Sequence, residues 1–515
     1  MIRKYRYLLT AAAAVGAAGL LTFAARNDFG LGRNMEIAVN MMRELSLNYV
    51  DPVDPDRLME GAAAGMVSDL DPYTEYIPEE GMQDFELLTT GKYDGIGALI
   101  RQKDDYVRIA QPYQGSPADK AGLKIGDKIL SIDGKDAKGF TTEQVSSRLK
   151  GEPGSKVKVT VEHLDGSTET VTLQRERISI PGVPYTGWVA DGIGYIRHSD
   201  FTEGCYEDMR AAVEKLRTGG ELKGLILDYR SNGGGIMQEA IKILGMFVPK
   251  GTEVVSTKGR TEDSRQVYRT SSEPILPDLP LAVLINGNSA SASEIVTGAL
   301  QDLDRAVVIG QRSYGKGLVQ TPRPLGYNAM LKLTTAKYYI PSGRCIQAID
   351  YSHSQEGTVR SVPDSLISEY TTRAGRKVYD GGGIMPDVFV PADTTDVTKY
   401  FVEVAGRNIL YRYTIEYADR HREALNAVKT IPELQALLDG DRGLVEDFIR
   451  YAARQGVAPN YRDIARSRKL IEAQLRAYIG RNTALEDNGF YANIYPVDNV
   501  IVRAVGILNE TREND

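Results

Sequence analysis

The sequence predicts a multidomain protein of the α/β (α+β) class. Its 515 residues correspond to three or four units at roughly 100–200 residues per domain. Hydrophobic residues make up 42% and charged residues 25% of the chain, which is typical of a globular protein and too apolar for disorder. The hydrophobic pattern also changes along the chain, from helical to β-rich, then to mixed and back to helical. These changes divide the chain into five segments.

The first segment, residues 1–26, has the pattern of a signal anchor or signal peptide. Arg3, Lys4 and Arg6 precede an apolar run over residues 7–25, which ends at Arg26. The small residues before Arg26 form a poor cleavage site, so an uncleaved anchor in the cell membrane is favoured over a cleaved peptide. Positive residues before the span predict that the rest of the chain is extracytoplasmic, on the periplasmic side. A buried N-terminal helix is disfavoured because the run has no polar face.

Residues 27–82 are predicted to be a helical segment. Apolar residues at helical spacing over residues 35–47, followed by two Asp-Pro pairs, predict helices across residues 35–76. This segment is either a spacer or the contact of a homodimer.

Residues 83–176 are predicted to form a compact β-rich module. Strand-like runs cover residues 97–101, 107–110, 129–132, 156–161 and 169–173, with helices over residues 117–121 and 142–149.

Residues 177–395 alternate strands and helices, which predicts an α/β core. Strands are expected at residues 193–196, 225–227 and 281–285, and helices at residues 205–216 and 295–302. The run at residues 281–285 is continuously apolar, as in a strand buried on both faces. Residues 396–515 are predicted to be a helical extension, for which the sequence indicates no role.

Charge and cysteine content exclude several classes of function. The net charge of −7 and the pI near 5.5 argue against a nucleic-acid partner, because phosphate binding needs clustered Lys and Arg. Cys205 and Cys345 are the only cysteines, so one disulfide is the maximum and a cysteine-rich zinc site is excluded. No metal ion or organic cofactor is implied.

An ordered set of glycines lies in the β-rich module. Tyr93, Asp94, Gly95, Ile96 and Gly97 are followed by a Ser-Pro-Ala-Asp-Lys-Ala-Gly-Leu run at residues 116–123 and by further glycines at positions 126 and 134. Any one of these glycines alone is better explained by a turn. The whole order resembles a PDZ domain over some 80 residues. The resemblance implies that residues 93–97 offer backbone N–H groups to a peptide's C-terminal carboxylate.

A candidate nucleophile follows the strand at residues 281–285. The chain continues as Asn-Gly-Asn-Ser-Ala-Ser-Ala-Ser-Glu over residues 286–294 and then enters a helix. A tight turn between a strand and a helix can hold a serine exposed, close to the helix N-terminus. Taken alone, this pattern is more often a helix cap. The residues themselves do not distinguish between Ser289, Ser291 and Ser293.

A lysine is the better candidate for the base. The chain has four histidines, none in a recognisable catalytic motif. Lysine acts as a base only when neutral, so its pKa near 10.4 must fall by roughly three units, which burial achieves. Lys316 has small and apolar neighbours and no nearby acid in the sequence, and Gln320 lies four residues on, at a spacing that can share its face.

Two other motifs are set aside. Residues 310–316 match the opening of a phosphate loop, G-x-x-x-x-G-K, but Gly317 replaces the required Ser or Thr. Residues 147–150 match S-x-x-K, but they fall within a predicted helix of the β-rich module.

Four motifs together resemble the C-terminal processing peptidases, also called tail-specific proteases, of peptidase family S41. They are the serine-rich run 289–294, Tyr-Gly-Lys-Gly at residues 314–317 with Gln320, Lys-Tyr-Tyr-Ile-Pro-Ser-Gly-Arg at residues 337–344, and Gly-Gly-Gly-Ile-Met-Pro-Asp at residues 381–387. The resemblance implies that Ser291 is the nucleophile, Lys316 the general base and Gln320 a support for the lysine.

The resemblance extends to the glycine loop at residues 231–235. It implies that the amides of Gly234 and Ala292 form the oxyanion hole, which typically contributes a few kcal/mol. Gly233 stands where many members of the family have proline, and Asn288 where many have glycine.

The sequence therefore predicts a serine endopeptidase that cleaves proteins or peptides near accessible C-termini, with the PDZ-like module binding the tail. Two alternatives remain open: a non-catalytic PDZ scaffold on a protease fold, and a lysine-assisted esterase or amidase acting on cell-wall material.

Overall fold

The structure is a computed structural model that describes residues 30–514, apart from residues 104, 114, 125, 164–165, 352–359 and 362–366. The predicted anchor at residues 1–26 lies outside the described residues. The chain divides into two compact units, one containing residues up to Glu79 together with Pro322–Leu333, and the other containing Glu80–Thr321 and Thr334–Asp515.

The first unit combines helices with one small piece of sheet. Residues 30–48 are helical, and α2 (Pro55–Val67) begins at Asp54, whose side chain caps it. Strand β1 (Glu75–Ile77) pairs antiparallel with residues 330–332 of β18 (Ala329–Tyr339). The prediction of helices as far as residue 76 was therefore wrong at its end, because residues 75–77 pair with a strand distant in the sequence.

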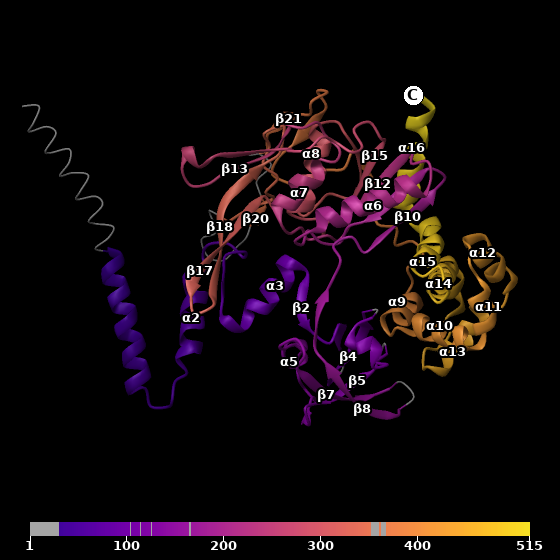
Figure 1. Cartoon of the computed structure of the whole chain (residues 1–515), viewed down its shortest axis with the longest axis horizontal. Coiled ribbons are helices and arrows are strands. Elements are labelled where there is room, and N and C mark those ends of the chain that lie inside the picture. The colour runs from indigo at the N-terminus through magenta and orange to yellow at the C-terminus, as the bar shows by residue number, and fades with distance from the viewer. Residues whose placement is uncertain are drawn as a thin grey trace, which may run out of the picture. The chain divides into compact units, whose positions relative to one another are not determined.

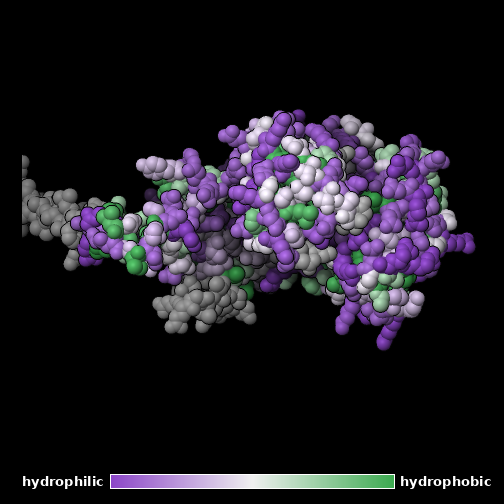
Figure 2. Space-filling view, turned by 90° about the horizontal axis from the view of Figure 1, so that it is seen from below, coloured by the Kyte–Doolittle hydropathy of each residue, from purple (hydrophilic) through white to green (hydrophobic). Residues whose placement is uncertain are grey.

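The helix at residues 30–48 leaves its apolar side chains uncovered. Leu31, Met35, Ile37, Val39, Met41 and Leu47 are each more than half exposed. Hydrophobic side chains, drawn in green, are visible on this helix in Figure 2. No helix among residues 30–514, as far as the structure describes them, has both the length and the apolar character needed to cross a membrane.

The β-rich module is an antiparallel sheet with the order β3-β4-β5-β7-β8. Its strands are β3 (Ala98–Lys103), β4 (Tyr106–Pro112), β5 (Lys128–Ile132), β7 (Lys156–Glu162) and β8 (Thr168–Gln174), and β6 (Lys135–Asp136) pairs with β5. Helices α4 (Pro117–Lys120) and α5 (Thr142–Leu149) complete it. Its apolar residues form a separate core, which includes Ile109, Ile129, Val145 and Val159. The predicted strands and helices are confirmed to within a few residues.

A two-stranded ribbon joins the two ends of this module. Strand β2 (Lys92–Gly95) pairs antiparallel with β9 (Glu176–Ser179). The short helix α3 (Met82–Thr90) precedes the ribbon and ends at Gly91, whose φ of 69° is the left-handed conformation that glycine adopts freely.

The α/β core is built on a six-stranded sheet with the order β10-β11-β12-β15-β16-β23. The strands are β10 (Tyr185–Ala190), β11 (Ile193–Arg197), β12 (Gly224–Asp228), β15 (Leu281–Ile285), β16 (Val307–Gly310) and β23 (Val388–Phe389). All pairs from β11 to β23 are parallel, and β10 is antiparallel at the edge. Every residue of β12 and β15 is buried, which confirms the mixed fold class and the doubly covered strand.

Different helices cover the two faces of this sheet. Helices α6 (Cys205–Gly219), α7 (Met237–Leu244) and α8 (Ala292–Asp302) form one large core with Leu225, Leu227 and Val283 (Figure 1). On the other face, Ile226, Ala282 and Leu284 pack with residues of α16 (Asn499–Asn514). The last helix of the chain therefore belongs to the core of the sheet.

A second, smaller sheet contains a long hairpin. Strand β18 pairs with β17 (Leu318–Gly326) and, at its C-terminal end, with β13 (Glu253–Lys258), which pairs with β14 (Gln266–Arg269). Two further pairs are short: β19 (Ile349–Asp350) with β20 (Arg360–Ser361), and β21 (Glu369–Thr371) with β22 (Lys377–Tyr379).

The C-terminal helices form a core of their own, which includes Tyr413, Phe448 and Leu475. They are α9 (Lys399–Gly406), α10 (Ile409–Arg420), α11 (Arg422–Ala427), α12 (Ile431–Gly440), α13 (Leu444–Arg454), α14 (Tyr461–Arg481) and α15 (Asp487–Ile494). The 3-10 turn η5 (Tyr495–Val497) connects them to α16.

Candidate active site

Ser291 lies at the sharp turn between β15 and α8, one residue before the helix begins. Its φ of 56° and ψ of −115° are sparsely populated for a residue with a side chain, and such a conformation costs about 1–3 kcal/mol. A strained strand–turn–helix connection is the arrangement that presents a serine nucleophile in hydrolases. The side chain is partly exposed.

The structure separates Ser291 from the two neighbouring serines. Ser289 and Ser293 are fully buried, and their hydroxyls donate to backbone carbonyls, Ser289 to Tyr229 at 2.9 Å and Ser293 to Asn232 at 3.0 Å. Both hydroxyls hold the turn together. Ser291 is the only one of the three that is accessible, which favours it as the nucleophile.

Glu294 connects the Ser291 turn to the segment that carries Lys316. One oxygen of its carboxylate accepts the backbone N–H of Ser291 at 2.8 Å and that of Lys316 at 2.9 Å. The other oxygen accepts the Gly315 amide at 2.7 Å and the Ser313 hydroxyl. Two segments that lie 25 residues apart in sequence therefore meet at one carboxylate.

Burial strongly affects this carboxylate. Glu294 is fully buried, and burial raises its pKa to about 7, although the donors from Ser313, Lys316, Gly315 and Ser291 all lower it. The carboxylate is therefore poised near neutral pH.

Tyr338 makes a second connection between the same two segments. Its hydroxyl lies 3.2 Å from the backbone carbonyl of Ser291 and donates to the backbone carbonyl of Lys316. The side chain is buried, and β18 positions it. Glu294 thus binds the amides, and Tyr338 the carbonyls, of Ser291 and Lys316.

Gln320 lies on β17, four residues after Lys316. Its side-chain amide donates to the Thr334 hydroxyl on β18 at 3.2 Å. This bond holds the Gln320 amide between the two strands of the β17–β18 hairpin, near the start of β17.

Gly234 lies directly against the nucleophile turn. A Cβ added at this glycine would fall 2.7 Å from the Ser291 Cβ and 2.8 Å from the Ala292 amide nitrogen, and its φ is 98°. The Gly234 N–H donates to the Asn232 side-chain oxygen at 2.8 Å. The two amides expected to form an oxyanion hole are therefore adjacent, but that of Gly234 is engaged by Asn232 in this conformation.

Residues 93–97 lie at the start of the β-rich module. Gly97 has a φ of 74°, and its carbonyl accepts the Ser116 hydroxyl at 2.8 Å and the Tyr113 amide at 2.9 Å. Asp94 pairs with Arg177 across the β2–β9 ribbon at 3.1 Å. Tyr93 is largely buried, and burial raises its pKa. The carbonyls of Asp94, Ile96 and Gly97 thus accept hydrogen bonds from within the domain, and residues 92–95 pair with β9.

Comparison with known proteins agrees with the motifs. The model of peptidase family S41 matches residues 192–353, and a PDZ domain model matches residues 108–163. Residues 31–81 match the N-terminal domain of the activating protease CtpB, and residues 400–484 match a family of unknown function.

Curated relatives extend the match beyond the individual domains. A carboxy-terminal-processing protease of Bartonella bacilliformis is 38% identical over 314 residues, which cover 60% of this chain and 72% of the relative. The chain belongs to peptidase family S41. A probable CtpA-like serine protease of Staphylococcus aureus is 35% identical over 316 residues, which cover 61% of this chain and 62% of that relative.

Among solved structures, the photosystem II D1 C-terminal processing protease has 27% sequence identity to this chain and a TM-score of 0.38. The match covers 69% of this chain and 87% of that protein. Membership in family S41 makes this chain a serine-type protease with a PDZ domain.

Two of the described histidines, His198 and His163, make contacts that indicate a structural role in this S41 protease. Burial lowers the pKa of His198 to about 3, and its ring lies against Phe201 and Tyr229. His163 pairs with Asp127 in the PDZ domain. Among the described residues, no group of three or more His, Cys, Asp or Glu side chains is arranged to hold a metal ion, and both cysteines are free thiols.

The phosphate-loop match is also explained by the fold. After Gly310 the chain runs irregularly through Lys316 and enters strand β17, whereas a phosphate loop leads into a helix.

Sequence reasoning missed Glu294 and Tyr338 as functional residues. Glu294 stands three residues after Ser291, the spacing at which a side chain reaches back to the start of a helix. That spacing was a usable signal. Tyr338 is part of the motif at residues 337–344, but nothing in the sequence indicates its contacts.

Proposed function

We propose that this S41 protease is an endopeptidase that cleaves protein or peptide substrates near their C-termini with a Ser291–Lys316 dyad. The observation that carries this proposal is the shared carboxylate of Glu294, which accepts the backbone amides of both residues on one oxygen. The accessible position of Ser291 between two buried serines supports the same assignment.

In the proposed reaction, the Ser291 Oγ attacks the scissile carbonyl while the neutral Lys316 Nζ takes its proton. The tetrahedral oxyanion is stabilised by the amides of Gly234 and Ala292, and the amide of Ala292, at the start of α8, benefits from the helix dipole. Lys316 then gives the proton to the leaving amine, and water hydrolyses the acyl-enzyme by the same route. Gln320, held by Thr334, would orient the lysine without stabilising its charge. No cofactor takes part.

The experiment compares the full chain with Ser291→Ala and Lys316→Ala on an unfolded test protein. Both variants are expected to fold and to lack activity, whereas Ser289→Ala, which loosens the turn but keeps the nucleophile, should still cleave at a reduced rate. Cleavage by Ser291→Ala would show that the nucleophile is misassigned.

We further propose that the PDZ-like domain, residues 83–176, binds the substrate tail through the amides of residues 93–97. A free C-terminal carboxylate is the ligand that such a loop favours. A substrate with an amidated C-terminus should therefore bind less tightly, with a higher KM than its free-acid counterpart. Equal KM values would contradict tail recognition by this loop.

For the remaining segments, the proposal assigns residues 177–395 to the protease core and residues 396–515 to a helical extension. It assigns residues 1–26 to a signal anchor or signal peptide that keeps the enzyme extracytoplasmic, at the membrane. The exposed apolar face of residues 30–48 supports a homodimer contact. Protease accessibility in intact cells tests the location. The mass in detergent, measured for the parent chain and for Ile37→Asp, tests the dimer.

A further inference from the structure

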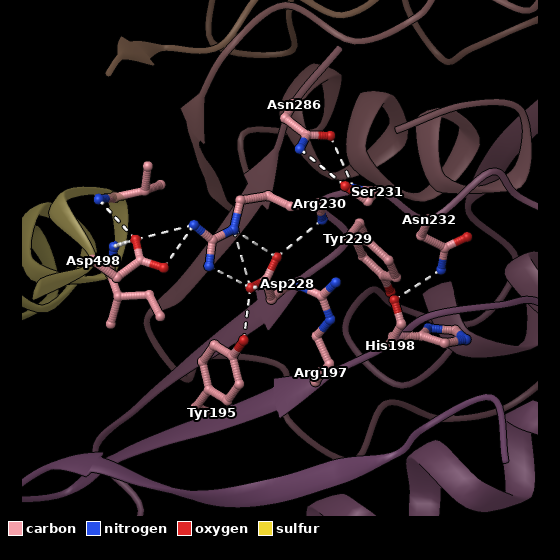
Figure 3. A network of polar contacts seen from close by, with 12 residues as sticks. Tyr195, Arg197, His198, Asp228, Tyr229, Arg230, Ser231, Asn232, Asn286 and Asp498 are labelled. Carbon is pink, nitrogen blue, oxygen red and sulfur yellow. Dashed lines mark hydrogen bonds and ion pairs between the residues drawn. The ribbon is translucent and has the colours of Figure 1, made fainter. Parts of the chain in front are cut away.

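The C-terminal segment reaches the glycine loop beside Ser291. Asp498, between η5 and α16, forms an ion pair with Arg230, whose Nη1 lies 2.9 Å from one carboxylate oxygen and 3.0 Å from the other (Figure 3). Arg230 is the residue immediately before the loop at residues 231–235. Each side chain is only 18% exposed, so water screens the pair weakly.

Arg230 is held on two sides. Its Nε and Nη2 donate to Asp228, a fully buried carboxylate that also accepts the Tyr195 hydroxyl at 2.6 Å and pairs with Arg197 at 3.2 Å. The cluster therefore contains two arginines and two aspartates, with no net charge. Loss of the Asp498 charge would leave one positive charge unbalanced in a shielded place, and it would free one side of the Arg230 guanidinium.

Asp498 itself is fixed independently of the loop. Its carboxylate accepts the backbone amides of Val500 at 3.1 Å and Ile501 at 3.2 Å, which caps α16. Val500, Ile501, Ala504 and Leu508 of this helix are buried against the sheet. Arg230 is thus attached to a rigid part of the core.

The loop needs such an attachment because its own backbone is permissive. Ser231 has a φ of 60°, and the three glycines that follow Asn232 include two with positive φ. Among the described residues, no atom apart from those of its two chain neighbours lies within 4 Å of where a Cβ of Gly233 would lie. The other side of the loop is held by Asn286, which accepts the Ser231 amide at 2.9 Å, and by Asn232, whose carbonyl accepts the Ala290 amide at 3.0 Å. Arg230 is the side-chain anchor where the chain enters the loop.

We propose that Asp498 is a positioning residue for catalysis: by holding Arg230, it fixes the loop at residues 231–234 beside the nucleophile. The end of the C-terminal extension is then part of the support of the active site. This inference rests on the proposed function for its effect on the rate. A purely structural role, as a helix cap, is the alternative that the test must exclude.

The test uses the full chain with Asp498→Asn. Asparagine caps a helix as well as aspartate does, so α16 is preserved while the charge is lost. The matched control is Asp447→Asn, which breaks the ion pairs of Asp447 with Arg420 and Arg450 within the C-terminal helices. A misplacement of 1 Å costs about 100-fold in rate, and loss of this one anchor should shift the loop by less than that. For Asp498→Asn we therefore expect kcat to fall about tenfold with KM nearly unchanged. Asp498→Glu, which keeps the charge, should recover most of this loss, and Asp447→Asn should retain the parent kcat.

Hydrogen exchange gives a readout that does not depend on activity. Peptides covering residues 229–236 should exchange faster in Asp498→Asn than in the parent or in Asp447→Asn, while peptides of α16 exchange as in the parent. Unchanged exchange in the loop, or faster exchange in α16 alone, would overturn the positioning role. If the parent chain proves inactive, the proposed function fails, and the exchange result still decides this inference.

Discussion

Replacing Glu294 by alanine should remove the connection that holds Ser291 and Lys316 together. The carboxylate is fully buried and accepts three backbone amides and one hydroxyl. The Ser313 hydroxyl can turn to another acceptor, but the three amides of Ser291, Gly315 and Lys316 are fixed by the chain. Alanine therefore leaves three donors without this acceptor, that of Gly315 buried and those of Ser291 and Lys316 partly buried.

The magnitude follows from the cost of each unmet donor. A buried donor that loses its partner costs about 1–3 kcal/mol, so Glu294→Ala should lower the free energy of unfolding by at least about 3 kcal/mol. In Glu294→Gln, the remaining oxygen can keep the Ser291 and Lys316 amides while the new NH₂ group donates to Ser313. Only the Gly315 amide is then unmet, with a loss of about 1–3 kcal/mol. The order of stability and of kcat should be parent, Gln, Ala.

Trp188 on β10 is the only tryptophan of the chain, so its fluorescence reports urea unfolding of the core sheet. The control is Glu239→Gln. Glu239 is a buried glutamate of α7 that accepts the Tyr206 amide and pairs with Lys242. This control should lower stability and leave kcat unchanged. If Glu294→Ala unfolds within 1 kcal/mol of the parent, or if the alanine and glutamine variants have equal kcat, the proposed role of the carboxylate is wrong.

Three further predictions concern the same site. The folded-state pKa of Glu294 is raised to about 7 from 4.5. Its contribution to stability is therefore complete below pH 4.5 and is lost as the pH rises through 7, by about 3 kcal/mol. Glu294→Gln should lack this pH dependence when the free energy of unfolding is compared at pH 5 and pH 8. Tyr338→Phe removes the hydroxyl that contacts the backbone carbonyls of Ser291 and Lys316, and it should slow labelling by a serine-reactive fluorophosphonate about tenfold with a stability loss of only about 1 kcal/mol. Gly234→Ala places a Cβ 2.7 Å from backbone and should abolish labelling, whereas Gly233→Ala, in open space, should not.

Local patterns in the sequence predicted much of the fold. The PDZ strands alternate buried and exposed residues, as in β7, and α5 begins with a complete capping box at Thr141. The continuous apolar run of β15 correctly predicted a strand covered on both faces. By contrast, β1 was missed because its partner, residues 330–332 of β18, lies some 250 residues away in sequence. Pairing of that kind leaves no local signal.

The site could be predicted only in part, for the same reason. The resemblance indicated Ser291, Lys316 and Gln320, but the residues alone did not distinguish the three serines, which differ in burial in the structure. The position of Asp498 beside Arg230 joins residues 268 apart in sequence and has no signature in either segment. What the sequence could not supply was the network of contacts that holds the predicted residues in place.

The engagement of Gly234 by Asn232 is compatible with a role of this amide in catalysis, and the relevant energies show why. A single hydrogen bond of this kind contributes about 0.5–1.5 kcal/mol net, whereas a donor in an oxyanion hole contributes about 2.7–4 kcal/mol in the transition state. A developing oxyanion can therefore outcompete the Asn232 side chain for the amide. Exchanging one acceptor for the other needs a permissive backbone, and Gly233, which has open space beside it in the part of the chain that the structure describes, provides it. The same permissiveness makes an external anchor necessary, because a loop that can turn toward the oxyanion can also turn away from it, and the Asp498–Arg230 pair limits that freedom where the loop begins.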